Sequence, residues 1–320
     1  MLLALCRKCL LTLITLSLLS LISYSILLRD PLNSLGDGSI VLGYFKYVEG
    51  LLHADLGISY SNGEPLTAQV LSVFPATITL CLSALLLSLL LGIPLGFIVA
   101  YIRKTTIGKL LTVAGSLSLA VPVFWLALLL LYYASINHWG IASVGELHPI
   151  YEIQPLTGFR ILDIFSTDSP HKLKMVQSAL HHLVLPTLVL GIPSTLEVMR
   201  FTQERAEYVL KQNYIKVAQT RGLSAFHIWR THILGNTLPA LIPTIARHFT
   251  VIFAFGMLIE NIFSWGGIGR WLVNALAIQN YNAISAGVVV IGSFVLFVDL
   301  LTGLIKTLLD PSQKKDWYAK

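Results

Sequence analysis

The hydrophobic positions of the chain are gathered into long runs that polar segments separate. A helix needs about 20 mostly apolar residues to cross the roughly 30 Å hydrocarbon core of a bilayer. The runs here are continuously apolar, whereas strands of a membrane barrel would alternate in segments of about 10 residues. The pattern therefore predicts an all-α membrane protein with six transmembrane helices. They are expected at residues 9–28, 76–102, 110–134, 183–199, 241–263 and 284–305.

Composition supports this prediction, because 55% of the 320 residues are hydrophobic and only 12% are charged. Soluble proteins carry roughly 25% charged residues. The first run follows Arg7 and Lys8 as in a signal peptide, but it lacks a small-x-small cleavage site and is expected to be a retained anchor. The fourth run is the weakest, since Pro186, Gly191 and Pro193 interrupt it.

The distribution of basic residues predicts the orientation. If the amino terminus is cytoplasmic, fifteen of the 22 Lys and Arg residues fall on inside segments and six on outside segments. The positive-inside rule then places both termini in the cytoplasm. Topology thus accounts for the net charge of +6, and no basic patch interleaved with aromatic residues suggests nucleic-acid binding. Residues 29–75 and 135–182 become long external segments, and 200–239 becomes the one large cytoplasmic loop.

The cytoplasmic loop has the pattern of a helical hairpin. Residues 201–221 contain neither proline nor glycine, which predicts one helix, and Gly222 can supply the left-handed residue that ends it. Ser224 is a candidate N-cap for a second short helix that carries Phe226 and Trp229. The hairpin could fit a groove on a soluble partner or pack only against the protein's own helices. The sequence pattern leaves both alternatives open.

The loop resembles the EAA loop of permease subunits of ATP-binding-cassette (ABC) importers. That loop has a glycine shortly after two small residues and a downstream Leu-Pro, and Val217-Ala218, Gly222 and Leu238-Pro239 occupy these places. Lys216 and Val217 replace the name-giving Glu and first Ala. Stretches along nearly the whole chain resemble the dipeptide and oligopeptide branch of this family. These stretches are residues 54–59, 122–126, 214–224, 232–238, 260–265, 298–301 and 310–311.

Within that branch, the long second external segment and the closing Asp316-Trp317-Tyr318 resemble the B permeases of bacterial Sap peptide-transport systems. The resemblance implies a type I importer permease architecture. Residues 1–74 would form an anchor helix and a periplasmic segment, and residues 311–320 a cytoplasmic tail. Residues 75–310 would form the permease domain, with its coupling loop near 201–239.

The resemblance also implies a function and a set of partners. The chain would be the permease subunit of an ATP-driven system in the bacterial inner membrane, transporting peptides that include antimicrobial peptides. A second homologous permease, two cytoplasmic ABC ATPases and a periplasmic solute-binding protein would complete it. The residues expected to contact an ATPase are Tyr214, Lys216, Val217, Ala218, Arg221, Gly222, Leu223 and Ser224. No cofactor is expected on this chain, which is not expected to be an enzyme.

Four ionisable residues in or near the spans are candidates for the transport pathway or an interface, because charge is costly in a membrane. Structural alternatives exist for each. Glu197 and Arg247 could reach water by snorkelling, Glu260 could cap backbone amides, and Asp299, near the middle of the last span, needs a partner. Glycine replaces a proline of the family pattern at Gly266, so a looser turn is expected there.

Two other functions compete with the leading one. An ion-coupled secondary transporter is suggested by Asp299, Glu260 and the interrupted fourth run. An ABC permease for another small cationic cargo, such as a polyamine, is the second. The chain has no Gly-x-x-x-x-Gly-Lys-Ser/Thr phosphate loop and no hydrolase motif, so the energy must come from a partner or an ion gradient. No metal site is expected, since neither Cys6 and Cys9 nor His181-His182 has further ligands nearby in sequence.

Overall fold

The structure is a computed structural model that describes residues 2–30, 39–118, 120–141, 144–151, 153 and 156–309, without the side chains of 2–5 and 306–309. The predicted tail at 311–320 lies outside these residues. So do the motif residues Asp310-Pro311 and Asp316-Trp317-Tyr318.

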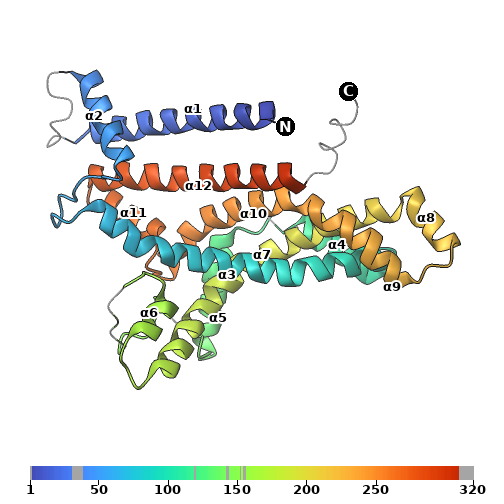
Figure 1. The fold of residues 1–320 in the computed structure, drawn as a ribbon. Coiled ribbons are helices and arrows are strands. Elements are labelled where there is room, and N and C mark those ends of the chain that lie inside the picture. Colours follow the sequence, from blue (N-terminus) through green and yellow to red (C-terminus); the bar gives the residue numbers. More distant parts are fainter. Residues whose placement is uncertain are drawn as a thin grey trace. The chain divides into compact units, whose positions relative to one another are not determined.

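Helices make up the regular structure of the described residues, apart from one isolated bridge between Ile58 and Pro65 (Figure 1). The all-α prediction is therefore confirmed. In chain order the helices are α1 (Leu2–Leu27), α2 (Ile40–Leu52), α3 (Leu66–Ile102), α4 (Thr106–Ser116), α5 (Val123–Ile136), α6 (Arg160–Ser166), α7 (Lys172–Leu210), α8 (Asn213–Thr220), α9 (Ala225–Ile228), a π-helical turn (Trp229–Leu234), α10 (Gly235–Ile262), α11 (Ile268–Ala277) and α12 (Tyr281–Leu309).

Among the described residues, 5 helical stretches are long and apolar enough to cross a membrane. They are Cys6–Leu27, Leu66–Ile102, Lys172–Leu210, Ala225–Ile262 and Tyr281–Ile305. The third predicted run, 110–134, differs, because it is divided between α4 and α5. Pro122 stands at the N-cap of α5, so α4 ends before it and only the 14-residue α5 continues the apolar run.

The fourth run also differs from the prediction, since α7 is one helix through Pro186 and Pro193. Each proline removes one backbone hydrogen bond. Membrane helices tolerate this loss where neighbouring groups and packing compensate. Leu185 and Val189 of this stretch are fully buried, and Thr187 bonds the hydroxyl of Ser83 on α3 at 2.7 Å. The interruption inferred from the sequence is therefore wrong.

The chain divides into two compact units, which are described separately. Unit 1 contains residues 1–79, 138–184 and 256–300, and unit 2 contains residues 80–137, 185–255 and 301–320. Unit 1 holds α1, α2, α6 and α11. Unit 2 holds α4, α5 and the hairpin that includes α8 and α9.

In unit 1, hydroxyl groups from three helices meet in a buried cluster. The Ser23 hydroxyl lies 2.8 Å from that of Tyr47 and 2.7 Å from that of Ser285, and it donates to the carbonyl of Ser285 at 2.8 Å. These residues belong to α1, α2 and α12. Hydrogen bonds between side chains replace water here and fix the three helices against one another.

In unit 2, glycines allow α3 and α7 to approach closely. A Cβ at Gly92 would lie 2.8 Å from the carbonyl oxygen of Thr195, and one at Gly96 would lie 2.5 Å from Cβ of Thr202. Small residues at such crossings are typical of membrane helices, where van der Waals packing supplies much of the association energy.

This packing predicts that Gly96→Ala destabilises the protein by about 1–3 kcal/mol, because the added methyl group must push the helices apart. Gly235→Ala is the matched control, since both positions are helical but a Cβ at Gly235 meets no atom within 4 Å. The measurement is thermal unfolding in detergent. An equal melting temperature for the two variants would contradict the close approach.

Candidate functional site

The hairpin begins where α7 ends at Leu210. The single helix predicted over 201–221 is wrong, since the chain turns at Lys211 and Gln212 before α8 begins at Asn213. Gln212 has extended backbone angles, with φ −71° and ψ 147°, and its N–H donates to the carbonyl of Val209 at 3.0 Å. No proline or glycine marks this break, so composition gave no sign of it.

The end of α8 at Gly222 follows the prediction. Gly222 has a left-handed backbone with φ 77°. Its N–H donates to the carbonyl of Gln219 at 3.0 Å, and the N–H of Leu223 donates to the carbonyl of Ala218 at 3.3 Å. These two bonds are the Schellman arrangement. A Cβ at Gly222 would meet nothing within 4 Å, so backbone conformation and not lack of space favours glycine here.

The next helix starts as predicted at Ser224, whose hydroxyl accepts a hydrogen bond from the N–H of His227 at 3.2 Å. It is not a separate short helix, however. Residues Ala225–Ile228 pass through the π-helical turn Trp229–Leu234 directly into α10. The second arm of the hairpin is therefore the first part of a long helix.

The inner face of the hairpin packs against its own unit. Ile215 and Ala218 of α8 and Ile228 and Ile233 of the following segment are buried. They form one cluster with Phe97 and Ala100 of α3 and Ala206 and Val209 of α7. The ring of Trp229 also meets that of Phe97 edge to face, with centroids 6.0 Å apart. The hairpin is thus held by the ends of α3 and α7.

The outer face of the hairpin is apolar and exposed. Phe226 is 68% exposed, and Tyr214, Val217 and Leu223 are exposed as well. Of the eight residues expected at an ATPase contact, Ala218 is buried and the other seven are exposed. The two alternatives left open by the sequence therefore apply to opposite faces: one face packs within the chain and the other is available to a partner.

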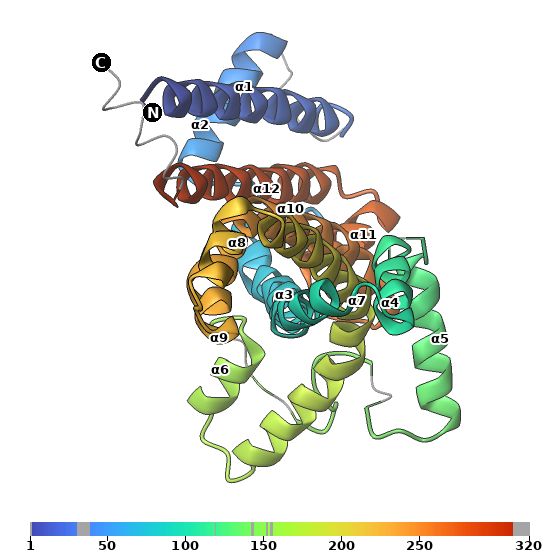
Figure 2. The ribbon, with the colours of Figure 1, turned by 90° about the vertical axis from the view of Figure 1, so that its right-hand side faces the viewer.

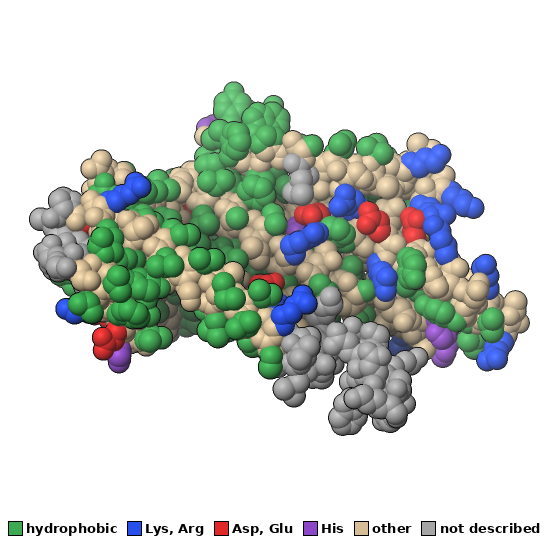
Figure 3. Space-filling view, turned by 90° about the horizontal axis from the view of Figure 1, so that it is seen from above, with side chains coloured by type: hydrophobic (Ala, Val, Ile, Leu, Met, Phe, Trp, Pro, Cys, Tyr) green, Lys and Arg blue, Asp and Glu red, His purple; other side chains and the backbone are tan. Residues whose placement is uncertain are grey.

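Basic side chains surround this outer face. Lys211, Lys216, Arg221 and Arg230 are all exposed. Figure 3 shows Lys and Arg side chains gathered at the end of unit 2 that carries α8 and α9. Exposed apolar groups ringed by charge are typical of a docking surface for a soluble protein.

A polar network lies behind the hairpin. Arg103 forms an ion pair with Glu207. The side-chain amide of Gln203 donates to the hydroxyl of Thr112 at 2.9 Å and to Glu207 at 3.0 Å. The network joins the end of α3 to α4 and α7. Sequence reasoning missed Arg103 and Glu207 as a pair, because only the fold brings these residues of opposite charge together.

Glu197 and Arg247 lie in the same part of unit 2. Glu197 is buried, and Nδ1 of His248 lies 3.0 Å from its Oε2. Burial contradicts the alternative in which Glu197 snorkels to water. Arg247 is exposed. Its guanidinium lies 5.5 Å from the centre of the Phe201 ring, and the guanidinium of Arg200 lies 5.0 Å from the same ring centre. No sequence pattern marked His248 as the partner of Glu197.

Glu260 and Asp299 belong to unit 1, and each has a local partner. Oε2 of Glu260 accepts hydrogen bonds from the N–H groups of Gly269 at 2.7 Å and Arg270 at 3.2 Å, in the first turn of α11. A carboxylate at a helix N-terminus is favourable, so the expected capping is present. Nζ of Lys8 lies 3.2 Å from Oδ2 of Asp299 and donates to its backbone carbonyl at 2.6 Å.

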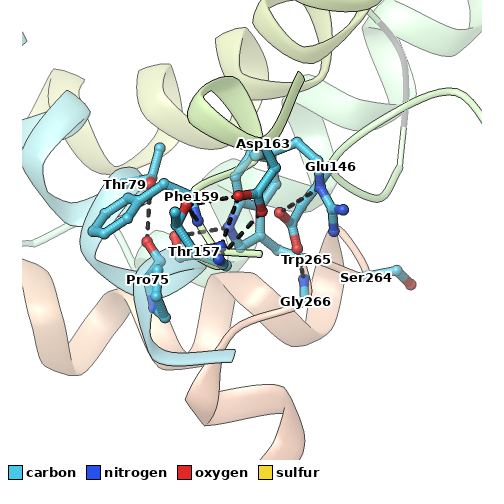
Figure 4. Close-up of polar contacts among 12 residues, drawn as sticks. Pro75, Thr79, Glu146, Thr157, Phe159, Asp163, Ser264, Trp265 and Gly266 are labelled. Carbon is cyan, nitrogen blue, oxygen red and sulfur yellow. Dashed lines mark hydrogen bonds and ion pairs between the residues drawn. The ribbon is translucent and has the colours of Figure 1, made fainter. Parts of the chain in front are cut away.

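Glu146, in the second external segment, holds the turn between α10 and α11 (Figure 4). Its Oε1 accepts a hydrogen bond from the N–H of Gly266 at 3.1 Å, and its Oε2 lies 3.4 Å from Nε of Arg160. The Gly145 N–H donates to the carbonyl of Phe263 at 2.7 Å. The looser turn expected at Gly266 is therefore wrong. A proline there could not donate this bond.

The same turn is fixed from α3. The indole N–H of Trp265 donates to the carbonyl of Ala76 at 3.0 Å, and the N–H of Ile268 donates to the hydroxyl of Thr77 at 2.8 Å. Beside it lies an open cavity of about 380 Å³ lined by Glu146, Leu147, His148, Pro149, Tyr151, Ile153, Arg160, Ser264 and Gly266. Among the described residues no group of three or more His, Cys, Asp or Glu could hold a metal ion.

The Glu146 contact predicts that Gly266→Ala is destabilising. A Cβ at Gly266 would lie 2.3 Å from Oε1 of Glu146, so the end of this side chain must turn away and its hydrogen bond is weakened, at a cost of about 1 kcal/mol. Gly140→Ala in the same external segment is the control, because a Cβ there meets nothing within 4 Å. Thermal unfolding in detergent compares them, and equal stabilities would refute the contact.

Comparison with known proteins gives one matching family. Residues 92–315 match the binding-protein-dependent transport system inner membrane component family. The peptide transport system permease protein SapB of Haemophilus influenzae is 44% identical over 301 residues, which cover 94% of each chain.

Two further relatives carry different names. The putrescine export system permease protein SapB of Escherichia coli K12 is 39% identical over 313 residues, 98% of each chain. The dipeptide transport system permease protein DppB of the same strain is 30% identical over 279 residues, 84% of this chain and 79% of the relative. The resemblance found in the motifs thus extends over nearly the full length.

Proposed function

The chain belongs to the family of binding-protein-dependent transport system inner membrane components, and on this premise we propose that it is the permease subunit of an ATP-driven peptide transporter. As a multi-pass inner-membrane subunit, it forms half of the translocation pathway, and a second homologous permease forms the other half. Cargo is delivered by a periplasmic solute-binding protein.

The observation that carries this proposal is the two-faced hairpin around Gly222. Its inner face is packed against α3 and α7, while Tyr214, Val217 and Phe226 remain exposed on its outer face. A cytoplasmic ATPase subunit docks on this outer face, with Lys216, Arg221, Leu223 and Ser224 around it. The chain itself has no phosphate-binding loop, so ATP hydrolysis belongs to two such partner subunits.

Coupling follows from how the hairpin is held. When ATP closes the pair of ATPases, the docked hairpins move with them. The cluster of Ile215, Ala218 and Phe97 and the Arg103–Glu207 pair transmit that motion to α3 and α7, and the π-helical turn transmits it to α10. Packed helices that move as rigid bodies give two discrete states, open inward or outward. Differential binding of the ATPases to these states drives the exchange.

The orientation is part of the proposal. Both termini lie in the cytoplasm, which places the basic surface around α8 inside and the cavity beside Glu146 outside. The excess of Lys and Arg on the inner segments supports this arrangement. Glu197, Arg247, Glu260 and Asp299 then serve the helix bundle chiefly through the local partners described above.

Peptides, including antimicrobial peptides, are the proposed cargo. The names of the Haemophilus SapB and of DppB support peptides, whereas one relative is named for putrescine export. A small cationic cargo such as a polyamine is therefore the second candidate. The assembled complex should show ATPase activity that peptide and binding protein stimulate. Stimulation by putrescine alone would favour the second candidate, and purification without any ATPase would contradict a permease.

An ion-coupled secondary transporter has lost its structural motivation. Asp299 is paired with Lys8, Glu260 caps the first turn of α11, and α7 is not interrupted. Each feature that suggested ion coupling thus has an explanation within the fold. The prediction is that Asp299→Asn retains ATP-dependent transport, since ion pairs this exposed contribute about 1 kcal/mol or less. Abolished uptake with the complex still assembled would restore the alternative.

The docking surface predicts the effect of Phe226→Asp. The added charge should weaken ATPase binding tenfold or more, equivalent to about 1.4 kcal/mol, because exposed aromatic residues often dominate interfaces. Stability should not change, since the side chain is already 68% exposed. Co-purification of the ATPase and cargo-stimulated hydrolysis are the measurements.

Ile150→Asp is the control for that variant, because Ile150 is 75% exposed in the external segment. It should retain the ATPase. If Phe226→Asp also retains it with unchanged activity, the outer face of the hairpin is not the docking surface.

A further inference from the structure

Helix α2 has a face that is fixed to unit 1. Gly43 is buried. The Tyr44 hydroxyl lies 2.8 Å from that of Ser20, and the Tyr47 hydroxyl lies 2.8 Å from that of Ser23. The Tyr24 hydroxyl on α1 donates to the carbonyl of Ile40 at 3.0 Å. These bonds set the rotation of α2 about its own axis, so the directions of its other faces are determined.

A second face of α2 is an exposed apolar stripe. Val41, Phe45, Val48 and Leu52 follow at intervals of four, three and four residues, which places them on one side of a helix. Val41 is 63%, Phe45 64% and Leu52 82% exposed, and Val48 between them is partly buried. The chain does not cover this stripe within its described part, although such residues favour burial at about 25 cal/mol per Å².

The third face of α2 is charged and lies beside the stripe. Lys46, Glu49 and His53 are exposed between the stripe and the fixed face, and the exposed Leu42 stands with them at the start of the helix. A helix with apolar and charged faces side by side matches the boundary between acyl chains and headgroups.

The direction of α2 fits the same boundary. In both Figures 1 and 2, α2 lies across the axis of α1, and both helices belong to unit 1. Cys6–Leu27 of α1 is apolar and long enough to span the bilayer. A helix that crosses α1 steeply beside residues 20–24, within its last two turns, lies near the plane of the membrane surface. Apolar side chains gather over the face formed by α1 and α2 (Figure 3).

We propose that α2 is an interfacial helix whose stripe of Val41, Phe45, Val48 and Leu52 is buried among the acyl chains of the leaflet at that surface. Lys46, Glu49 and His53 lie at headgroup level. Lipid is the occupant because the stripe accompanies the exposed apolar surface of the spanning helix α1, on which Leu18, Leu21 and Ile22 are exposed. Which leaflet this is rests on the proposed topology, which makes it the outer one.

The interfacial position of α2 has a structural consequence. Tyr47 shares the buried hydroxyl cluster with Ser23 of α1 and Ser285 of α12. A helix held at the membrane surface therefore fixes the neighbouring ends of two spanning helices at one depth. Helix α2 thereby anchors unit 1 at the membrane surface. The proposed ATP-driven motion enters the chain through the hairpin of unit 2.

The test uses the full-length chain in its assembled complex, with Cys6, Cys9 and Cys81 replaced by serine. Single cysteines are introduced as Phe45→Cys and Leu52→Cys on the stripe and Lys46→Cys and Glu49→Cys as controls, and each is labelled with bimane. Liposomes carry lipids with a nitroxide at acyl carbon 5 or 12. The stripe labels should be quenched at least about twofold more than the controls, and more by carbon 5 than by carbon 12.

Two results would overturn the proposal. Equal quenching of stripe and control labels by lipid nitroxides, together with quenching by aqueous iodide, would place the stripe in water. Protection of the stripe from both lipid and aqueous quenchers would show that a protein partner covers it. Separately, a membrane-impermeant thiol reagent added to intact cells should label Glu49→Cys. Labelling only from the cytoplasmic side would refute the proposed topology. It would not contradict the proposal that α2 lies at the membrane interface.

Discussion

The absence of water in hydrocarbon is the constraint on which the rest of this structure depends. Every polar group carried into the membrane must find its partner within the protein, because an unpaired one costs several kcal/mol. The backbone meets this requirement as helices. Side chains meet it in pairs and clusters: Ser23 with Tyr47 and Ser285, Glu197 with His248, and Glu260 with the first amides of α11. Polar contacts therefore specify which helices are neighbours.

The hairpin around Gly222 obeys a different rule, because its outer face carries exposed apolar side chains together with basic ones. Apolar side chains ringed by basic ones suit the soluble protein partner proposed above. The inner face of Ile215 and Ala218 is as tightly packed as the core, so the docking surface cannot move without the helices behind it. Rigidity on one side and exposure on the other are the properties that the proposed coupling to an ATPase requires.

Local sequence rules predicted much of this arrangement. Long apolar runs identified the spanning helices, and the left-handed Gly222 and the N-cap at Ser224 were recognised because glycine and serine have specific roles at helix ends. The same rules failed at Pro186 and Pro193, where buried packing outweighs the lost hydrogen bonds, and at Gln212, where a break has no composition signal. Partners such as His248 for Glu197 and Lys8 for Asp299 could not be predicted, since contacts distant in sequence depend on the fold.

Gly266 shows how a departure from a family pattern can add an interaction. A proline at this position has no N–H, whereas the glycine N–H donates to the carboxylate of Glu146. Glycine also leaves room for that carboxylate, because a Cβ here would lie 2.3 Å from its Oε1. The carboxylate in turn lies beside Arg160, so the turn before α11 is joined to the long external segment. Glycine in place of proline would by itself lower the stability of the folded turn, because it increases the conformational entropy of the unfolded chain. With Glu146 in place, the glycine N–H lets the external segment hold the turn, so Gly266 and Glu146 act as one structural feature.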